Sequence, residues 1–576
     1  MMNLFLIDAI GPFFRGHERR TINWSKIPFE YLKIEGPERE AQWSGIREEL
    51  DLFCERAAAM GYTAISLDDV THLADHAWYE LEVRARIAQW RVEFQRCIDI
   101  VRRHGLQVFF TMDVFSATPA VREQIARLRC KVEDYLAVLL EGFLRDFPEV
   151  AGVILRIGEA DARDVQHDFR SELYLKEPGQ VNHFLKTLLP VFEKQGRKLI
   201  FRTWTVGAYR IGDLMWHRRT FIRVLKGLEE NPALIVSMKY GESDFFRYLP
   251  LSRNFFHTRV AKIVELQTRR EYEGCGEYPS FTGWEYERYA RELEQATNMV
   301  GIMVWCQTGG WVPFRRLALL DESAVWTDLN TWVTLRLFKD RQLVEEAVRN
   351  FATARAIPDA QALLELLRLS DDVIRELLYV EEFARRQLFF RRVRIPPLLQ
   401  VYWHNIFINH SVKKVLGYFV QDKEACLRAA ALALQKLDHM QDLAATAQLP
   451  VADIVYMKDT FTILAMAREY YFQPFNEEIQ SRLRLTKKAY KAKYPKGGDR
   501  HRYRVKIDFQ PFWLKSRYLG WSLKLLMRRQ QGYRWTDRIF TLHLLSLIFR
   551  VIAKRRPHWI PGFAKDSAMG VDTVFK

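Results

Sequence analysis

The stretch LIVSMKYGESDFF, residues 234–246, joins a short apolar run to a cluster of polar and charged side chains. The run Leu234–Val236 has the length and composition of a buried β-strand, and Lys239 and Asp244 follow it closely. The same arrangement recurs through the first 310 residues, where nearly every apolar run ends in polar or charged groups. The eight runs are Leu4–Ile7, Ala64–Leu67, Val108–Phe110, Val153–Leu155, Leu199–Phe201, Leu234–Val236, Ile263–Leu266 and Ile302–Val304.

Amphipathic stretches of helical length separate most of these runs. They are Glu38–Met60, Glu80–His104, Val121–Phe147, Gln180–Gln195 and Trp284–Thr297. Strands that alternate with helices in this way predict an α/β protein with a (β/α)8 TIM barrel. Because the residues that follow the strands of such a barrel gather at one mouth, we expect the polar clusters to line a single pocket.

A helical region is predicted after the barrel. From Asn330 to about Gln473 the pattern is entirely helical, with periodic apolar positions in Leu335–Phe351, Asp359–Leu388 and Lys423–Leu443. The chain is therefore expected to have three parts. These are a barrel at residues 1–328, an all-α C-terminal domain at residues 329–480, and a basic, aromatic-rich helical tail at residues 481–576.

The tail carries the positive charge of the chain. Residues 481–576 contain 24 Lys and Arg but 5 Asp and Glu, whereas the whole chain of 576 residues has a net charge of +16. Within residues 512–556, apolar and aromatic side chains are interleaved with Lys and Arg, which suits peripheral contact with an anionic membrane. Packing of these helices on the C-terminal domain is the alternative. No nucleic-acid module is visible, so we expect no specific nucleic-acid binding.

Cysteine usage and hydropathy indicate the compartment. The six cysteines form no CxxC pair and no spacing with His that would suit zinc, so we expect neither a metal site nor a cofactor. Asp8 interrupts the short N-terminal apolar run, which argues against a signal peptide, and no stretch has the length of a membrane span. The prediction is a cytoplasmic protein, peripheral at the inner membrane face if the tail meets lipid. A homodimer through the helical domain stays open.

Three acidic residues that follow predicted strands are candidates for catalysis, namely Glu159, Asp244 and Glu271. Glycoside hydrolysis needs an acid that protonates the leaving oxygen and a carboxylate that activates water or attacks the sugar. Carboxylates from different strands of one barrel can straddle a glycosidic bond. The acids therefore point to a glycoside hydrolase. Glu273 and Glu277 are rivals to Glu271 within the same segment.

Three cations follow the fourth, fifth and sixth runs and are candidates for substrate binding: Arg156, Arg202 and Lys239. Such a cluster would hold the carboxylate or phosphate of an anionic sugar, and the alternative for each is a salt bridge to a nearby acid. Other side chains near the strand ends are candidates for contact with a sugar. They are Trp204, Tyr272, Trp305, Trp311, Asp69 and Asp113. Core packing is the alternative for the tryptophans, and His404 and His410 are expected to be structural.

Two segments resemble the family 67 α-glucuronidases. Those enzymes carry a lysine and a Gly-x-x-Asp-Phe element after one strand, then Glu-Leu-Gln-x-x-x-Glu-Tyr-x-Gly after the next. The matching residues here are Lys239, Gly241, Asp244, Phe245, Glu265, Leu266, Gln267, Glu271, Tyr272 and Gly274. The stretch LIFRTWTVG, with Arg202, is similar to the family's fifth-strand element, and GVILRIGEAD, with Glu159, is similar to the strand that bears the general acid.

The resemblance covers roughly residues 150–351 and implies an inverting, exo-acting enzyme that removes a uronic-acid-type sugar from an oligosaccharide or polysaccharide. It implies that Glu159 is the general acid, that Asp244 and Glu271 position and activate the water, and that Arg202 and Lys239 hold the sugar carboxylate. The chain departs from the family around the acid, where Ile157, Gly158 and Ala160 are unlike the family motif. The family's N-terminal β-domain is not expected, because the first strand begins near Asn3.

A different class of function also fits the sequence. The barrel could be a non-catalytic sugar-binding or scaffold module in envelope or exopolysaccharide metabolism, which its basic tail docks on a membrane. Retention of the three acids and of the basic pair favours the enzyme, because a pocket freed from chemistry need not keep them.

Overall fold

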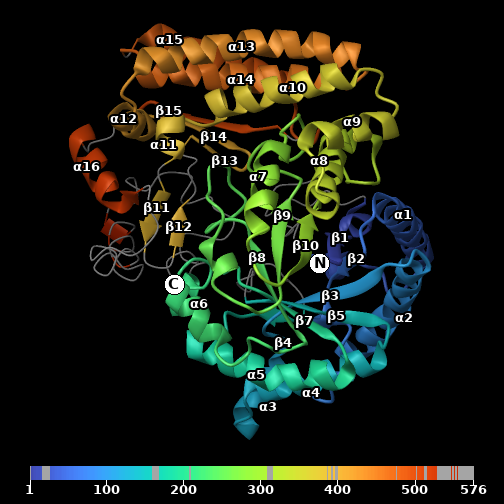
Figure 1. The fold of residues 1–576 in the computed structure, drawn as a ribbon. Coiled ribbons are helices and arrows are strands. Elements are labelled where there is room, and N and C mark those ends of the chain that lie inside the picture. Colours follow the sequence, from blue (N-terminus) through green and yellow to red (C-terminus); the bar gives the residue numbers. More distant parts are fainter. Residues whose placement is uncertain are drawn as a thin grey trace.

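The computed structural model covers the 576-residue chain and places most of it. The described residues are 2–15, 26–157, 168–205, 209–307, 316–385, 387–390, 393–395, 400–474, 476–500, 502–510 and 515–528, with 547, 551 and 554–555. A barrel forms the lower part of the molecule in Figure 1, and a layer of helices lies above it.

Eight parallel strands close into a barrel in the order β1-β10-β9-β8-β7-β5-β3-β2. The barrel closes at β1, where Leu4 pairs with Gly301 of β10 and Leu6 pairs with Ala64 of β2. Each of the eight apolar runs lies within one of these strands, so the predicted barrel is confirmed. The strands are β1 Leu4–Asp8, β2 Ala64–Leu67, β3 Gln107–Asp113, β5 Val150–Arg156, β7 Lys198–Arg202, β8 Leu234–Lys239, β9 Lys262–Gln267 and β10 Met299–Trp305.

The barrel strands are buried on both faces, which is why they read as continuous apolar runs. Gly301 shows how closely two of them approach. A Cβ atom at this position would lie 1.7 Å from the carbonyl oxygen of Leu4, so only glycine allows β10 to pair with β1 there. The register of β10 against β9 also shifts beside this residue, between Met299 and Gly301.

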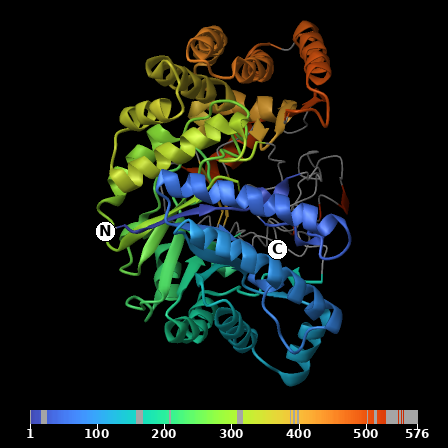
Figure 2. The same cartoon turned by 90° about the vertical axis from the view of Figure 1, so that its right-hand side faces the viewer.

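Helices cover the outside of the barrel, and α1 and α2 run side by side along it in Figure 2. The helix expected over residues 121–147 is two helices. Arg129 takes a left-handed conformation, with φ of 52°, and ends the first of them. No α-helix joins β8 to β9, where the described chain has only the 3-10 turn Arg253–Phe256. The helices are α1 Glu38–Met60, α2 Leu81–Arg103, α3 Pro119–Leu128, α4 Val132–Asp146, α5 Pro178–Gln195, α6 Arg218–Leu225, α7 Gly283–Leu293 and α8 Val325–Leu335.

The chain after the barrel is mostly helical, as expected. α13 and α14 pack along each other, and α10 and α15 complete the layer with them (Figure 1). Two π-helical turns, Arg336–Asp340 and Ile374–Leu378, continue α8 and α10. The remaining helices are α9 Val344–Ala354, α10 Ala360–Val373, α11 Glu381–Ala384, α12 His410–Phe419, α13 Lys423–Thr446, α14 Val451–Phe472, α15 Glu477–Lys493 and α16 Ser516–Leu526.

The expectation that residues 330–473 are entirely helical is wrong. The helix expected to reach Leu388 ends ten residues earlier, because Tyr379 adopts an extended conformation after the π-turn. Short strands follow and form two small sheets, in the orders β13-β14-β15 and β12-β11-β16. β11 with β12 and β13 with β14 are pairs of neighbouring strands, whereas the third strand of each sheet, β16 or β15, comes from about 100 or more residues further along the chain. The strands are β11 Gln387–Phe390, β12 Val393–Ile395, β13 Val401–Tyr402, β14 Asn405–Asn409, β15 Arg504–Asp508 and β16 Met527–Arg528.

The predicted domain boundaries fall inside helices. Residue 328 lies within α8, and residue 480 lies within α15. Tyr278, in the segment after β9, shares a hydrogen bond with the hydroxyl of Tyr503 and packs against Phe461 of α14. The helical layer therefore rests on the end of the barrel where the strands finish. In the described part of the chain, no helix combines the length and apolarity that a bilayer crossing requires.

Candidate active site

Lys239 and Asp244 form an ion pair at the end of β8. The ammonium nitrogen of Lys239 lies 2.5 Å from Oδ1 of Asp244, and the hydroxyl of Tyr272 donates to Oδ2 across 2.7 Å. Lys239 also lies between two rings, 3.7 Å from the ring centroid of Trp204 and 4.3 Å from that of Phe245. Lys239 and Tyr272 thus hold the carboxylate of Asp244 in place, and Trp204 packs on Lys239.

Glu271 lies beside this pair and is held very differently. Its backbone N–H donates to the side chain of Gln267, but its carboxyl oxygen Oε2 is buried and no described residue hydrogen-bonds it. Burial, and then the negative charge of Asp244, raise the pKa of Glu271 to about 8. Two neighbouring carboxyls are therefore present, of which one is ion-paired and the other favours its protonated form.

The rivals of Glu271 occupy structural ion pairs. The carboxylate of Glu273 accepts two hydrogen bonds from the guanidinium of Arg247, at 3.0 and 2.8 Å, and a third from the hydroxyl of Tyr379 at 2.6 Å. Although burial opposes it, the positive charge of Arg247 holds the pKa of Glu273 well below its usual range. Glu277 lies 3.6 Å from Arg316, and the same arginine binds Asp453 of α14. Both rivals therefore tie the barrel to the helical layer.

Arg202, at the end of β7, is paired inside the barrel. Its guanidinium makes two hydrogen bonds to Glu265 of β9, at 3.0 and 2.8 Å, and lies 4.7 Å from the ring centroid of Trp305. Glu265 is fully buried and also accepts from Ser237 and from the indole of Trp305. Arg202 is therefore in a salt bridge, which was the alternative to substrate binding, and Trp305 belongs to the same network.

Arg156, at the end of β5, belongs to a second charged cluster. Its Nε lies 3.0 Å from Oδ1 of Asp113, whose other oxygen is bound by Lys26 and, at 2.7 Å, by Ser171. Although burial opposes it, Lys26 and Arg156 hold the pKa of Asp113 well below its usual range. Asp68 lies 3.6 Å from Arg156, and burial raises the pKa of this carboxyl to about 6.

Of the remaining candidate residues, the structure describes some and not others. Asp69 accepts from the backbone N–H of Thr71 and contacts Nδ1 of His72, so it caps the N-terminal end of a short turn. Glu159 and Trp311 lie outside the described residues. The structure thus brings Asp244, Glu271, Lys239, Tyr272 and Trp204 together after β7, β8 and β9. Within the described part of the chain, no group of three or more His, Cys, Asp or Glu is placed to hold a metal ion.

Two contacts at this site went unpredicted. Gln267 positions the backbone of Glu271, and its place in the Glu-Leu-Gln motif was the available signal. Trp403, between β13 and β14, stacks on Tyr272 with ring centroids 6.2 Å apart and an angle of 11°. Nothing near Trp403 in the sequence indicates this, because the contact depends on how the chain after the barrel folds back onto it.

The fold is shared with a solved enzyme of low sequence similarity. No protein-family model matches the chain, and no curated protein matches it. Among solved structures, it is similar to a GH138 enzyme targeting pectin rhamnogalacturonan II, at a TM-score of 0.51 and 10% identity. That match covers 96% of this chain and 68% of the other. The likeness shows the fold.

A second solved structure, the β-mannanase from the blue mussel Mytilus edulis, matches more loosely. Its TM-score is 0.33 at 11% identity, over 59% of this chain and 94% of that chain. A likeness at this level supports no inference.

Proposed function

We propose that this protein is a glycoside hydrolase that removes a uronic-acid-type sugar from the end of an oligosaccharide or polysaccharide. One observation carries the proposal, namely the pairing of Glu271 with Asp244 at the ends of neighbouring strands. Asp244 is held by Lys239 and Tyr272, whereas Oε2 of Glu271 is buried with no hydrogen bond from any described residue. A carboxylate held in an ion pair, beside a second carboxyl whose pKa is raised, is suited to acid–base chemistry.

The proposed reaction inverts the anomeric carbon. Asp244 and Glu271 position a water and take one of its protons while its oxygen bonds to that carbon. The glycosidic C–O bond breaks, and Glu159 protonates the leaving oxygen in the role that the family 67 resemblance implies. A site of this kind needs about 6.5–9.5 Å between the acid and the base carboxyls, which leaves room for the water.

The proposal that the sugar is acidic depends on three cations at the strand ends. Arg156, Arg202 and Lys239 are the last residues of β5, β7 and β8, which are neighbouring strands of the barrel, and a uronate carboxylate would complement their charge. Each of the three is already paired with an internal carboxylate in the absence of substrate. The GH138 enzyme with the similar fold targets pectin rhamnogalacturonan II, which supports a polysaccharide substrate.

We expect the rate to rise with pH on the acid side of the optimum. Because the pKa of Glu271 is raised to about 8, the pair retains a proton in neutral solution, and activation of water requires its loss. The value of kcat/KM should therefore increase as pH rises toward about 8. A pH–rate profile of the wild-type protein checks this, and a rate that falls from pH 6 to pH 8 would assign Glu271 the role of proton donor instead.

The test of the function is hydrolysis of uronic-acid-capped oligosaccharides, each paired with its neutral counterpart. We expect release of the acidic sugar with inverted configuration, seen in the product anomers by NMR, and loss of that release in the Asp244→Ala variant. Cleavage of the neutral sugars alone would refute the acidic specificity. Binding of the oligosaccharides without cleavage would instead support the non-catalytic sugar-binding module.

A further inference from the structure

α16 presents aromatic and basic side chains to solvent. Trp521 is 60% exposed and Tyr518 is 50% exposed, which is high for side chains of this size. Arg517 and Lys524 are exposed on the same helix, and their spacing from Trp521 places all three on one face. A face that combines interfacial aromatics with cations is typical of helices that lie on an anionic membrane surface.

This helix is fixed to the folded body of the protein. α16 packs against α12, and Gly520 of α16 lies close to Tyr418 of α12. A Cβ atom at Gly520 would lie 2.1 Å from the ring of Tyr418, so only glycine allows the two helices to meet there. The position of α16 is therefore fixed by α12, and Trp521 is exposed on this anchored helix.

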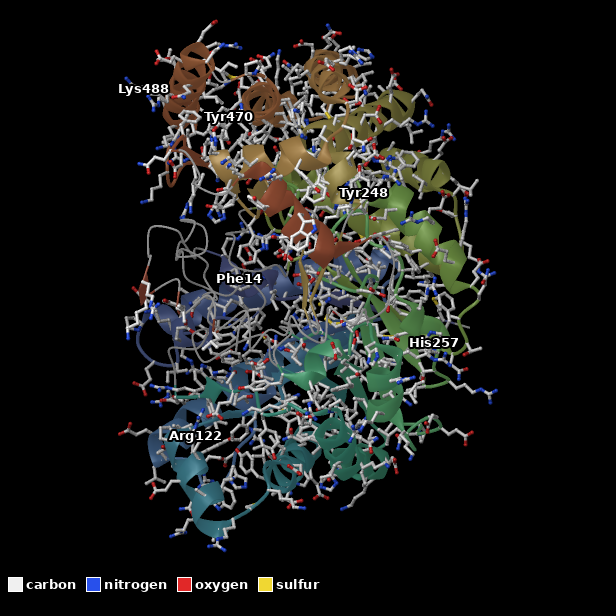
Figure 3. All side chains as sticks on the ribbon, turned by 90° about the vertical axis from the view of Figure 1, so that its left-hand side faces the viewer. Phe14, Arg122, Tyr248, His257, Tyr470 and Lys488 are labelled. Atoms are coloured by element: carbon white, nitrogen blue, oxygen red, sulfur yellow. The ribbon has the colours of Figure 1, made fainter. Side chains whose placement is uncertain are left out.

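A cationic groove adjoins the same side of the molecule. α12 contacts β14, which pairs in parallel with β15, and the groove lies between β15 and α15. It has a volume of about 560 Å³ and is lined by Arg484, Lys487, Ile507, Asp508, Phe509 and Gln510. Figure 3 faces this side and shows Lys488, one residue along α15 from the groove, at the edge of the molecule.

Three lysines of α15 form no ion pair among the described residues, whereas Arg482 and Lys493 of the same helix are paired with Glu469 and Asp459. The three lysines are Lys487, Lys488 and Lys491. Burial, and then repulsion by Lys491, lower the pKa of Lys487. Asp508 is the acidic residue that lines the groove. A surface that keeps several cations close together without matching acids favours an anionic partner.

Aliphatic side chains extend this pattern beyond α16. After residue 528 the described positions are Leu547, Val551, Lys554 and Arg555, all of them exposed and helical. Exposed leucine and valine beside lysine and arginine suit the headgroup boundary of a bilayer, whereas single-stranded nucleic acid is bound by aromatic stacking and cations.

We propose that α16 and the α15–β15 groove form a docking surface for an anionic lipid bilayer. Trp521 and Tyr518 enter the headgroup region, and the lysines of α15 face the negatively charged lipid surface. The proposal does not depend on the hydrolase function, because none of these residues belongs to the barrel mouth.

Flotation of the full-length protein with vesicles tests this surface. We expect binding to vesicles of phosphatidylglycerol and phosphatidylcholine in equal amounts, little binding to phosphatidylcholine alone, and release at raised ionic strength. Trp521→Ser should lower the vesicle partition coefficient roughly tenfold. The double variant Lys487→Glu/Lys488→Glu should lower the partition coefficient by at least about tenfold, because each cation near an anionic lipid surface contributes its own share of the binding free energy.

A matched charge reversal serves as the control. Lys186 and Lys226 are exposed on the barrel side of the molecule and have no ion pair among the described residues, so Lys186→Glu/Lys226→Glu should leave the partition unchanged. Equal loss in this control, equal binding to both vesicle types, or no vesicle binding by the wild type would each overturn the proposal. Binding of a single-stranded oligonucleotide in place of vesicles would assign the surface to nucleic acid. Circular dichroism melting curves confirm that each variant is folded.

Discussion

Replacing Glu271 with glutamine is expected to lower kcat by about 10³-fold while the protein stays folded. The amide has nearly the shape of the protonated acid, so the packing around Cβ and Cγ is kept. The amide cannot release a proton and so cannot accept one from water, which leaves Asp244, held by Lys239 and Tyr272, as the single carboxylate of the pair. Steady-state hydrolysis of the substrate found in the oligosaccharide panel measures this loss, and the rise of the rate toward pH 8 should disappear from whatever activity remains.

Glu277→Gln is the matched control for this prediction. Glu277 is equally buried and lies in the same segment, but it contacts Arg316 and Arg500 rather than Asp244. Its replacement should lower thermal stability and leave kcat at the wild-type order. If Glu271→Gln kept full activity, Glu271 would have no part in the chemistry and the assignment would fall.

Replacing Arg247 with methionine is expected to lower the free energy of unfolding by about 3–5 kcal/mol. Arg247 is buried and bridges Glu273, in the segment after β9, to Asp371 of α10. Methionine fills part of the space but leaves two buried carboxylates without their shared cation. Arg270 and Arg375 still contact one carboxylate each, so the loss is large but the network does not vanish. Urea unfolding measures the change.

Arg253→Met separates this effect from a general cost of losing an arginine. Arg253 lies in the same connection between β8 and β9, is exposed, and has no ion pair among the described residues. Its replacement should change the free energy of unfolding by less than about 0.5 kcal/mol. Similar costs for the two variants would show that the Arg247 bridge does not hold the helical layer to the barrel.

The barrel could be predicted because its signal is local. Each strand is an apolar run buried on both faces, and each is followed by polar residues that must reach the mouth. The helix at residues 38–60 was placed to the residue for a similar reason, since Gly61 ends it with φ of 102°. The break at Arg129 and the early end at Tyr379 were missed, because no glycine or proline marks them.

Part of the site could be predicted in the same way. Asp244 and Lys239 follow one strand and Glu271 follows the next, so their meeting at the mouth was implied by strand order. The partners of the cations were not implied. Arg202 is paired with Glu265, which is 63 residues away in the chain. Nothing in the sequence distinguishes Glu265 from the many other acidic residues as the partner of this arginine. Only the register of β7, β8 and β9 decides that these two groups meet.

The sequence by itself determined the barrel, the polar and charged clusters at the strand ends, and the concentration of basic charge in residues 481–576. These depend on residue type and spacing along the chain. The tertiary structure alone decided which of Glu271, Glu273 and Glu277 is ion-paired with arginine, because the three have the same side chain within one segment. Glu273 and Glu277 are ion-paired with arginines, whereas Glu271 lies beside Asp244 and forms no ion pair among the described residues. Their difference lies in their neighbours, which only the folded chain supplies.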